Sequence, residues 1–247
     1  MARLRIGVVR FPGSNCEQDC LEFFNDPEWA DAYGVSAEYL WHQSGTIDAG
    51  IDAVILPGGF SYGDTLRSGA LASLSPILRA VKEVAAQGKP VLGICNGFQM
   101  LTESGLLPGA LQLNRQGGFL CEAVALTLEN RSTFFTQGYS ASTGTEEAPL
   151  VLPIAHAEGN YTADEATLEA LHVNNQVVFQ YTSDINGSAG NIAGICNKPG
   201  NVLGLMPHPE RALYPTATTT ADGRKLFESL LQHLSSHTLA PCSFLSK

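Results

Sequence analysis

The sequence predicts an α/β fold in which a mostly parallel central sheet is flanked by helices and gains antiparallel strands in the second half of the chain. In the first hundred residues, short apolar runs of strand length alternate with stretches of helical periodicity. After Gly105, residues 119–129 alternate apolar and polar side chains, which is typical of an antiparallel or edge strand. The chain has 247 residues, 44% of them hydrophobic, which suits one domain. We expect a domain at residues 1–234 and a tail at residues 235–247.

The first half is expected to supply the parallel strands. They are expected at residues 4–9, 35–41, 53–56 and 91–94. Helices are expected at residues 17–24, 70–86 and 98–104. Ser14 or Asn15 can cap the first of these helices, and Gly105 can end the third. Because right-handed crossovers bring the C-terminal ends of parallel strands to one edge, we expect the functional site in the loops that leave this edge.

The second half is expected to supply further short strands and one helix. Besides residues 119–129, strands are expected at residues 151–155, 177–181, 192–196 and 202–206. The last helix is expected at residues 221–234. Residues 138–148 and 184–190 are predicted to be loops because small and polar residues dominate them.

The composition excludes several classes of function. A formal net charge of −10 at pH 7 argues against an electrostatic surface for nucleic acid or anionic membranes. The only close pair among the six cysteines, Cys16 and Cys20, lacks the spacing of a metal or redox motif, so we expect reduced thiols and no metal site. No apolar run has the length of a membrane span or a secretory signal, and we therefore expect a cytoplasmic protein.

Cys95 is the strongest candidate for a reactive residue. It stands between a buried strand and a helix, with Gly93 and Gly97 two positions to either side, as in a nucleophile elbow with Cys in place of Ser. The start of a helix favours the thiolate form, and the N–H of Asn96 is placed to receive an oxyanion. A buried structural cysteine is the alternative. Cys16 also lies at the start of a predicted helix, but no flanking glycines support it.

Ser61 is a second competitor, because Gly59, Ser61 and Gly63 match the Gly-x-Ser-x-Gly elbow of serine hydrolases. The glycine pair precedes this serine, however, and the next predicted helix begins several residues later. We therefore favour the interpretation that Gly58 and Gly59 form a loop that approaches Cys95 and donates an N–H to an oxyanion.

His208 and Glu210 are the candidate partners of the thiol. A proline on each side of His208 disfavours helix and holds the backbone extended, so both side chains are expected to project to the same side. The carboxylate can then orient one imidazole nitrogen and leave the other for the thiol. A solvated histidine in a surface turn is the alternative. Among the remaining histidines, only His156 is kept as a binding candidate, with a hydrogen-bonded histidine at a strand end as the simpler interpretation.

Together these residues resemble the triad, or class I, glutamine amidotransferases, whose fold is flavodoxin-like. The residues that match the motifs Gly-x-Cys-x-Gly-x-Gln and His-Pro-Glu are Gly93, Cys95, Gly97, Gln99, His208 and Glu210. The likeness covers residues 4–234 and is closest to the group that supplies ammonia for purine biosynthesis. Segments 58–64, 93–99, 153–159, 191–195 and 206–211 carry this closer likeness. Ala157 and Ser68 depart from it, since Gly and Cys are expected there.

The resemblance implies that the chain is a glutaminase with Cys95, His208 and Glu210 as its catalytic residues. The residues that it assigns to the oxyanion and to glutamine are Gly58, Gly59, Phe60, Asn96 and Gln99. Gln99 either contacts the substrate amide or braces the elbow. The implied partners are a large synthetase subunit, which converts formylglycinamide ribonucleotide to the amidine, and a small bridging subunit.

The chain contains no phosphate-binding motif, so we expect no cofactor in it, and ATP and magnesium on the synthetase partner. Three alternatives remain open. They are a cysteine or serine hydrolase on the same scaffold, the glutaminase subunit of a different amidotransferase, and a non-catalytic binding protein.

Overall fold

A computed structural model describes residues 3–139, 149–216 and 220–238. Five strands form its parallel part: β1 (Leu4–Arg10), β2 (Val35–Trp41), β3 (Ala53–Leu56), β4 (Val91–Ile94) and β11 (Val202–Leu205). Four strands form its antiparallel part: β6 (Leu120–Leu128), β7 (Leu150–His156), β9 (Val177–Tyr181) and β10 (Ile192–Cys196). A separate pair consists of β5 (Ala110–Gln112) and β8 (Asn160–Thr162).

The nine strands of the main sheet run in the order β2-β1-β3-β4-β11-β10-β9-β6-β7. Every pairing from β2 to β11 is parallel, and every pairing from β11 to β7 is antiparallel. The predicted fold class is confirmed. The sequence pattern did not reveal that β11, the last strand of the chain, pairs with β4 and thereby belongs to the parallel part.

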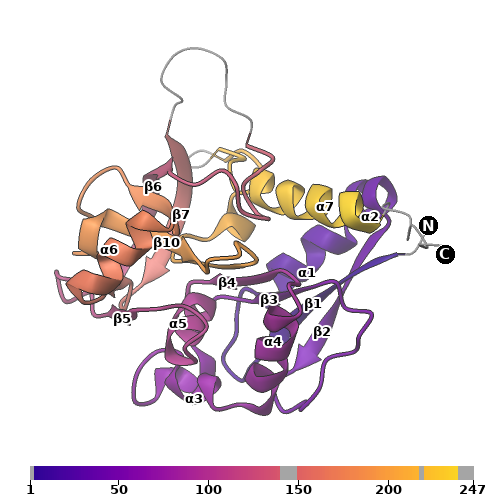
Figure 1. Ribbon diagram of the computed structural model, residues 1–247, viewed down its shortest axis with the longest axis horizontal. Coiled ribbons are helices and arrows are strands. Elements are labelled where there is room, and N and C mark those ends of the chain that lie inside the picture. The colour runs from indigo at the N-terminus through magenta and orange to yellow at the C-terminus, as the bar shows by residue number, and fades with distance from the viewer. Residues whose placement is uncertain (1–2, 140–148, 217–219, 239–247) are drawn as a thin grey trace, which may run out of the picture.

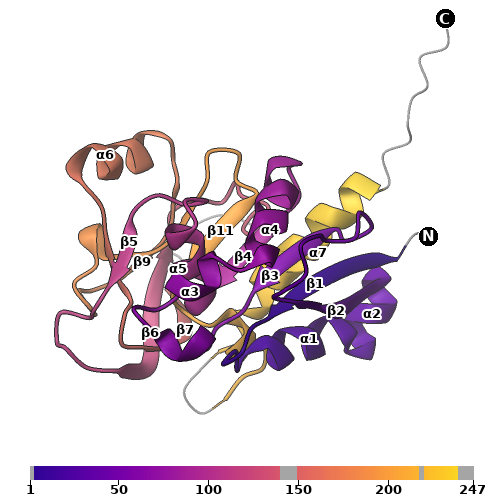
Figure 2. The ribbon, with the colours of Figure 1, turned by 90° about the horizontal axis from the view of Figure 1, so that it is seen from below.

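Helices cover both faces of the parallel part. One face carries α1 (Glu17–Asn25), α2 (Pro27–Tyr33) and α7 (Arg224–Thr238), and the other carries α3 (Ala70–Ser73), α4 (Pro76–Ala86) and α5 (Asn96–Glu103) (Figure 1). Helix α6 (Glu165–Val173) lies at the opposite end of the molecule, beside the antiparallel part (Figure 2). None of the described helices is both long and apolar enough to cross a membrane.

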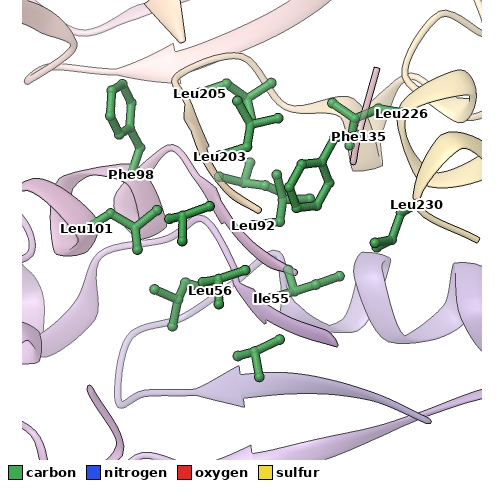
Figure 3. Close-up of a cluster of buried hydrophobic side chains, with 14 of the residues drawn as sticks. Ile55, Leu56, Leu92, Phe98, Leu101, Phe135, Leu203, Leu205, Leu226 and Leu230 are labelled. Atoms are coloured by element: carbon green, nitrogen blue, oxygen red, sulfur yellow. The ribbon is translucent and has the colours of Figure 1, made fainter. Parts of the chain in front are cut away.

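The core of the parallel part fixes the position of α5. Side chains of β3, β4 and β11 meet α5 on one side and α7 on the other (Figure 3). The labelled residues are all buried: Ile55, Leu56, Leu92, Leu203 and Leu205 on the strands, Phe98 and Leu101 on α5, Leu226 and Leu230 on α7, and Phe135 between strands and α7. Apolar burial of this kind contributes about 25 cal/mol per Å². It holds the start of α5 against the ends of β3 and β4.

The helix predicted at residues 70–86 is in fact two helices. Ser75 takes an extended conformation, with ψ at 144°, between the end of α3 and the start of α4 at Pro76. The residue before a proline is pushed out of the helical region, and proline lacks the N–H that would continue the preceding helix. The prediction of one continuous helix was therefore wrong.

Two helices were missed although their end signals are present. For α2, Asp26 accepts the Glu28 N–H, Pro27 is the first residue and Gly34 follows in the left-handed region. For α6, Asp164 accepts the Thr167 N–H. The last helix continues beyond the predicted end at residue 234. Most of the loop predicted at residues 138–148, and the tail from residue 239, lie outside the described residues.

Candidate active site

The pairing of β4 with β11 brings the Cys95 and His208 loops together. These parallel strands place Ile94 opposite Leu205. The Cys95 N–H donates to Leu205 O at 2.8 Å, so Cys95 leaves β4 at the level where the chain leaves β11 toward His208. Two loops that are far apart in the sequence therefore share one edge of the sheet.

Cys95 occupies a sharp turn at the start of α5. Its φ of 50° and ψ of −105° are unusual for a residue with a side chain and indicate local strain. Neither flanking glycine has room for a side chain. A Cβ on Gly93 would lie 2.5 Å from Leu101 Cδ1, and a Cβ on Gly97 would lie 2.0 Å from Leu56 O. The structure thus forms the elbow that the two glycines predict.

The glycine loop after β3 lies between the elbow and the first loop of the chain. Gly58 O accepts the N–H groups of Asn15 and Cys16. A Cβ on Gly58 would lie 2.6 Å from His208 Cε1, so only glycine allows the imidazole to approach this closely. Gly59 has a φ of +140°, and its Cβ would lie 2.7 Å from Asn15 N. The predicted approach of Gly58 and Gly59 to the site is present, and the contact with residues 13–16 was not predicted.

Two backbone donors in the loops at this edge of the sheet lack acceptors. In the part of the chain that the structure describes, neither the Gly59 N–H nor the Asn96 N–H has a hydrogen-bond acceptor. Asn96 is the first residue of α5, where N–H groups have no partner within the helix. They are the two donors that the sequence assigns to an oxyanion, and that assignment stays a prediction.

His208 is buried and held from two sides. Its backbone N–H donates to Pro153 O at 2.8 Å, and Nδ1 lies 2.6 Å from Glu210 Oε1. Burial alone lowers the pKa of His208, but the Glu210 carboxylate and the Cys95 thiol outweigh burial and raise this pKa well above its ordinary value. Nε2 has no hydrogen-bond partner among the described residues. The imidazole can therefore carry a proton and present it at Nε2.

The backbone between His208 and Glu210 differs from the prediction. His208 is extended, but residues Pro209–Arg211 form a short 3₁₀ turn. Proline favours the first position of a helical turn because its φ is already fixed there. The prediction of a continuous extended backbone was wrong, and a tight turn brings the carboxylate to the imidazole instead.

Asn96 and Gln99 connect the elbow to its surroundings. Asn96 Oδ1 accepts the Ser61 N–H at 3.1 Å, and Asn96 Nδ2 donates to Gln99 Oε1 at 2.8 Å. Gln99 Nε2 donates to Glu158 O at 2.6 Å. Both polar ends of the Gln99 amide are thus engaged within the protein. Of the two roles that the resemblance implies for Gln99, the geometry favours bracing.

Phe60 and Ser61 follow the glycine pair. The Ser61 hydroxyl lacks the surroundings of a nucleophile, and the glutamine-binding role of Phe60 stays a prediction. The Phe60 ring is 44% exposed and its centroid lies 6.3 Å from that of Phe119 at the surface. Ser61 Oγ is buried and has no hydrogen-bond partner among the described residues. A serine nucleophile needs an adjacent base, and this hydroxyl has none.

Cys16 is a neighbour of His208 rather than a competing thiolate. Its Sγ lies 3.8 Å from His208 Nδ1 and 2.9 Å from Asn15 Oδ1. Burial raises the pKa of the Cys16 thiol, and the contact with His208 offsets this only in part. The sequence analysis disfavoured Cys16 as the reactive thiol, and its raised pKa agrees with that. The sequence did carry a signal for its location, since the loop after β1 leaves the same sheet edge as the loops after β3 and β4.

His156 lies on the antiparallel side and is engaged within the protein. Its Nδ1 lies 3.1 Å from Asn114 Oδ1. Burial, together with the charge of His208, lowers the pKa of His156 to about 4, so the ring is neutral near pH 7. The simpler interpretation, a hydrogen-bonded histidine at a strand end, agrees with this geometry. Asn114, which the sequence analysis missed, also accepts the Gly159 N–H at 3.1 Å.

Comparison with known proteins supports one family. Residues 3–234 match the CobB/CobQ-like glutamine amidotransferase domain. A structure of PurLQS from Thermotoga maritima contains a chain that is 40% identical, with a TM-score of 0.79, and the match covers 94% of this chain and 99% of that one. Two more distant structures share the fold. One is a putative GMP synthase component from Thermoplasma acidophilum, with 15% identity, a TM-score of 0.61 and coverage of 96% of this chain and 97% of that one. The other is a glutamine amidotransferase from Thermotoga maritima, with 17% identity, a TM-score of 0.53 and coverage of 98% of this chain and 88% of that one.

The fold and the site thus define a glutamine amidotransferase, and the chain belongs to the CobB/CobQ-like family of these enzymes. More narrowly, it is of the type that serves as the glutaminase component of phosphoribosylformylglycinamidine synthase. The resemblance inferred from the motifs is confirmed at both levels. The alternative of a different hydrolase on this scaffold is not favoured.

Proposed function

We propose that this chain hydrolyses glutamine to glutamate and ammonia at Cys95 and passes the ammonia to a synthetase subunit. One observation carries the assignment of the residues. A single edge of the sheet holds an elbow thiol, two backbone N–H groups without acceptors among the described residues, and a buried His208–Glu210 pair. That combination is what amide hydrolysis through a thioester requires.

In the first step, the Cys95 sulfur attacks the side-chain carbonyl carbon of glutamine. The oxyanion that forms accepts the N–H groups of Gly59 and Asn96. His208 holds the proton lost by the thiol at Nε2 and gives it to the amide nitrogen as the carbon–nitrogen bond breaks. Glu210 accepts from Nδ1 and stabilises the charged ring. The products of this step are ammonia and a γ-glutamyl thioester.

In the second step, water replaces ammonia. The now neutral Nε2 of His208 removes a proton from water, and the hydroxide attacks the thioester carbon. The same two N–H groups hold the second oxyanion. The carbon–sulfur bond then breaks, glutamate leaves, and Cys95 regains its proton from His208.

The ammonia is consumed, in this proposal, by a large ATP-dependent synthetase subunit that forms formylglycinamidine ribonucleotide, with a small subunit bridging the two. ATP and magnesium bind to that synthetase, and this chain holds no cofactor. The 40% identity to a chain of PurLQS supports this partnership. We place the complex in the cytoplasm, in keeping with five free cysteines among the described residues.

A glutamine-like electrophile tests the nucleophile. Treatment with diazo-oxo-norleucine, followed by intact mass and peptide mapping, is expected to give one adduct on Cys95 that excess glutamine blocks. Cys95→Ala is expected to give none. An adduct on Ser61 or Cys16 in the wild type would show that Cys95 is not the nucleophile.

A reconstituted complex tests the partner. Glutamine turnover by the isolated chain is expected to be slow and to rise when the synthetase subunits, formylglycinamide ribonucleotide and ATP are added. Equal turnover with and without the synthetase would argue against activation by assembly. Labelling of Cys95 in the isolated chain remains informative in that case, because it reports the nucleophile and not the partner.

A further inference from the structure

Two residues of the proposed active site also belong to a cluster of metal-ligating side chains. The third member of this cluster, Cys16, has no role in the proposed hydrolysis. Cys16, His208 and Glu210 are all buried, and each offers a ligand atom within 4.8 Å of the other two. Thiolate, imidazole and carboxylate are the donors that bind zinc and related cations in proteins. No two of these residues have the sequence spacing of a metal motif, and the fold alone brings them together.

The distances fit a tetrahedral cation with a small adjustment. Zinc lies about 2.3 Å from sulfur and about 2.0 Å from nitrogen, so two such ligands stand about 3.5 Å apart. Cys16 Sγ and His208 Nδ1 are 3.8 Å apart. Glu210 Oε1 is too close to Nδ1, at 2.6 Å, to share a cation with it. Its second oxygen, Oε2, is buried without a hydrogen-bond partner among the described residues and is the one available.

An acidic pocket leads from the surface to this cluster. It has a volume of about 360 Å³, and Glu210 lines it together with Asp19, Glu22 and Asp26. Arg211 is the one cation among the described residues of the lining; it pairs with Asp19 at 3.5 Å and also interacts with the Cys16 sulfur. A divalent cation can therefore approach Glu210 along carboxylates.

We propose that Cys16, His208 and Glu210 form a binding site for a thiophilic divalent cation of the Zn²⁺ class. Binding releases two protons to solvent, one from the Cys16 thiol and one from His208 Nδ1, while Glu210 is already a carboxylate. A cation on Nδ1 breaks the His208–Glu210 hydrogen bond and prevents the ring from holding a second proton. Cation binding therefore arrests the glutaminase, and this consequence alone rests on the proposed function.

Co²⁺ tests the site without any activity assay. In untagged Cys95→Ala protein, one equivalent of Co²⁺ is expected to give the charge-transfer absorption of cobalt bound to a thiolate. The absorption is expected to vanish in Cys95→Ala/Cys16→Ala and in Cys95→Ala/Cys16→Ser. The matched control is Cys95→Ala/Cys20→Ala, because Cys20 is buried on the next turn of α1 and outside the cluster. Absence of the band, or its survival without Cys16, overturns the site.

Zn²⁺ tests the consequence. The wild type is expected to lose glutaminase activity as Zn²⁺ is added and to recover it with a chelator. Cys16→Ala is expected to retain its basal activity and to need at least about tenfold more Zn²⁺ for half inhibition, a loss of about 1.4 kcal/mol in binding. Equal inhibition of both proteins would place the inhibitory cation on Cys95 and overturn the mechanism. If the wild type has no glutaminase activity even with the synthetase subunits present, the proposed function fails, and the Co²⁺ band still decides the site.

Discussion

The parallel and antiparallel parts of the sheet contribute different groups to the site. Cys95, Gly59 and His208 each follow a strand of the parallel part, where side chains and N–H groups emerge at one edge. The antiparallel part contributes mainly backbone carbonyls of β7. Pro153 O accepts the His208 N–H, and Ala155 O lies 3.7 Å from Cys95 Sγ.

The position of the strand ends explains the difference. Backbone groups within both kinds of ladder pair with neighbouring strands, whereas the C-terminal ends of the parallel strands meet at one edge and carry the loops of the site. Strand β7 is last in the pairing order, and its carbonyl meets the loop after β11 instead of water. We therefore expect changes in the parallel part to alter the chemistry, and changes in the antiparallel part to alter stability.

Glu210→Gln is expected to have the largest effect among these predictions. The uncharged amide can no longer outweigh burial, so the pKa of His208 falls. Turnover is expected to drop about 10³-fold, and the basic limb of the pH profile of kcat/KM, where the imidazolium loses its proton, is expected to move to lower pH. Steady-state assays across pH measure both. An unmoved basic limb would mean that Glu210 positions the loop and does not set the charge of His208.

Gly58→Ala is expected to lower kcat about 10²-fold, since its Cβ would lie 2.6 Å from His208 Cε1 and must displace the ring. Gly45→Ala is the control, because nothing lies within 4 Å of a Cβ at that position. Thermal unfolding and kcat are to be measured for both variants. Loss of folding in Gly58→Ala, or normal kcat with a normal fold, would contradict the assignment of this glycine to ring placement.

Local signals in the sequence predicted most strands of the parallel part and most residues of the site. The elbow could be predicted because Gly93, Cys95 and Gly97 are neighbours in sequence, and the packing that excludes a Cβ acts within one strand and one helix. The pair of His208 and Glu210 could be predicted because the two residues are two positions apart. Even there, Pro209 started a turn that the extended interpretation did not include.

Contacts between distant segments could not be predicted in the same way. The position of Cys16 beside His208 depends on the order of β1, β3, β4 and β11 in the sheet, which no periodicity encodes. Burial, which raises the pKa of the Cys16 thiol, follows from the same packing. Asn114 was missed because its partners are mostly backbone groups, and these leave no pattern in the sequence.

Asn114→Ala is expected to destabilise the protein by about 3 kcal/mol with kcat changed less than about threefold. Its side chain donates to His156 O and accepts the Gly159 N–H, and the buried groups that it leaves unpaired cost about 1–3 kcal/mol each. Asn174→Ala, which removes an exposed side chain bonded to its own helix, is expected to cost less than about 0.5 kcal/mol. Urea unfolding measures both. Asn114 contacts His156 of β7, so a large loss of kcat in folded Asn114→Ala would show that the antiparallel part also affects the chemistry.

His208 and His156 are both buried, and their contributions to stability respond to pH with opposite sign. The pKa of His208 is raised in the folded state, so its contribution to stability is fully present below the unfolded value of about 6.5 and is lost as pH rises through the folded pKa. The pKa of His156 is lowered to about 4, so its contribution is present above about pH 6.5 and is lost as pH falls toward 4. The two pH ranges meet near about pH 6.5: below it the His156 contribution rises with pH, and above it the His208 contribution falls.

His156→Gln separates the two contributions, because glutamine does not titrate. The unfolded histidine gains a proton between pH 7 and pH 5.5 while the folded one does not, and this weakens the wild type by about 1 kcal/mol over that interval. The cost of the substitution, measured by urea unfolding, is therefore expected to be about 1 kcal/mol smaller at pH 5.5 than at pH 7. His208 contributes equally to both proteins and drops out of the difference. The same cost at both pH values would show that His156 is protonated in the folded protein, and that the antiparallel part carries a charge next to His208.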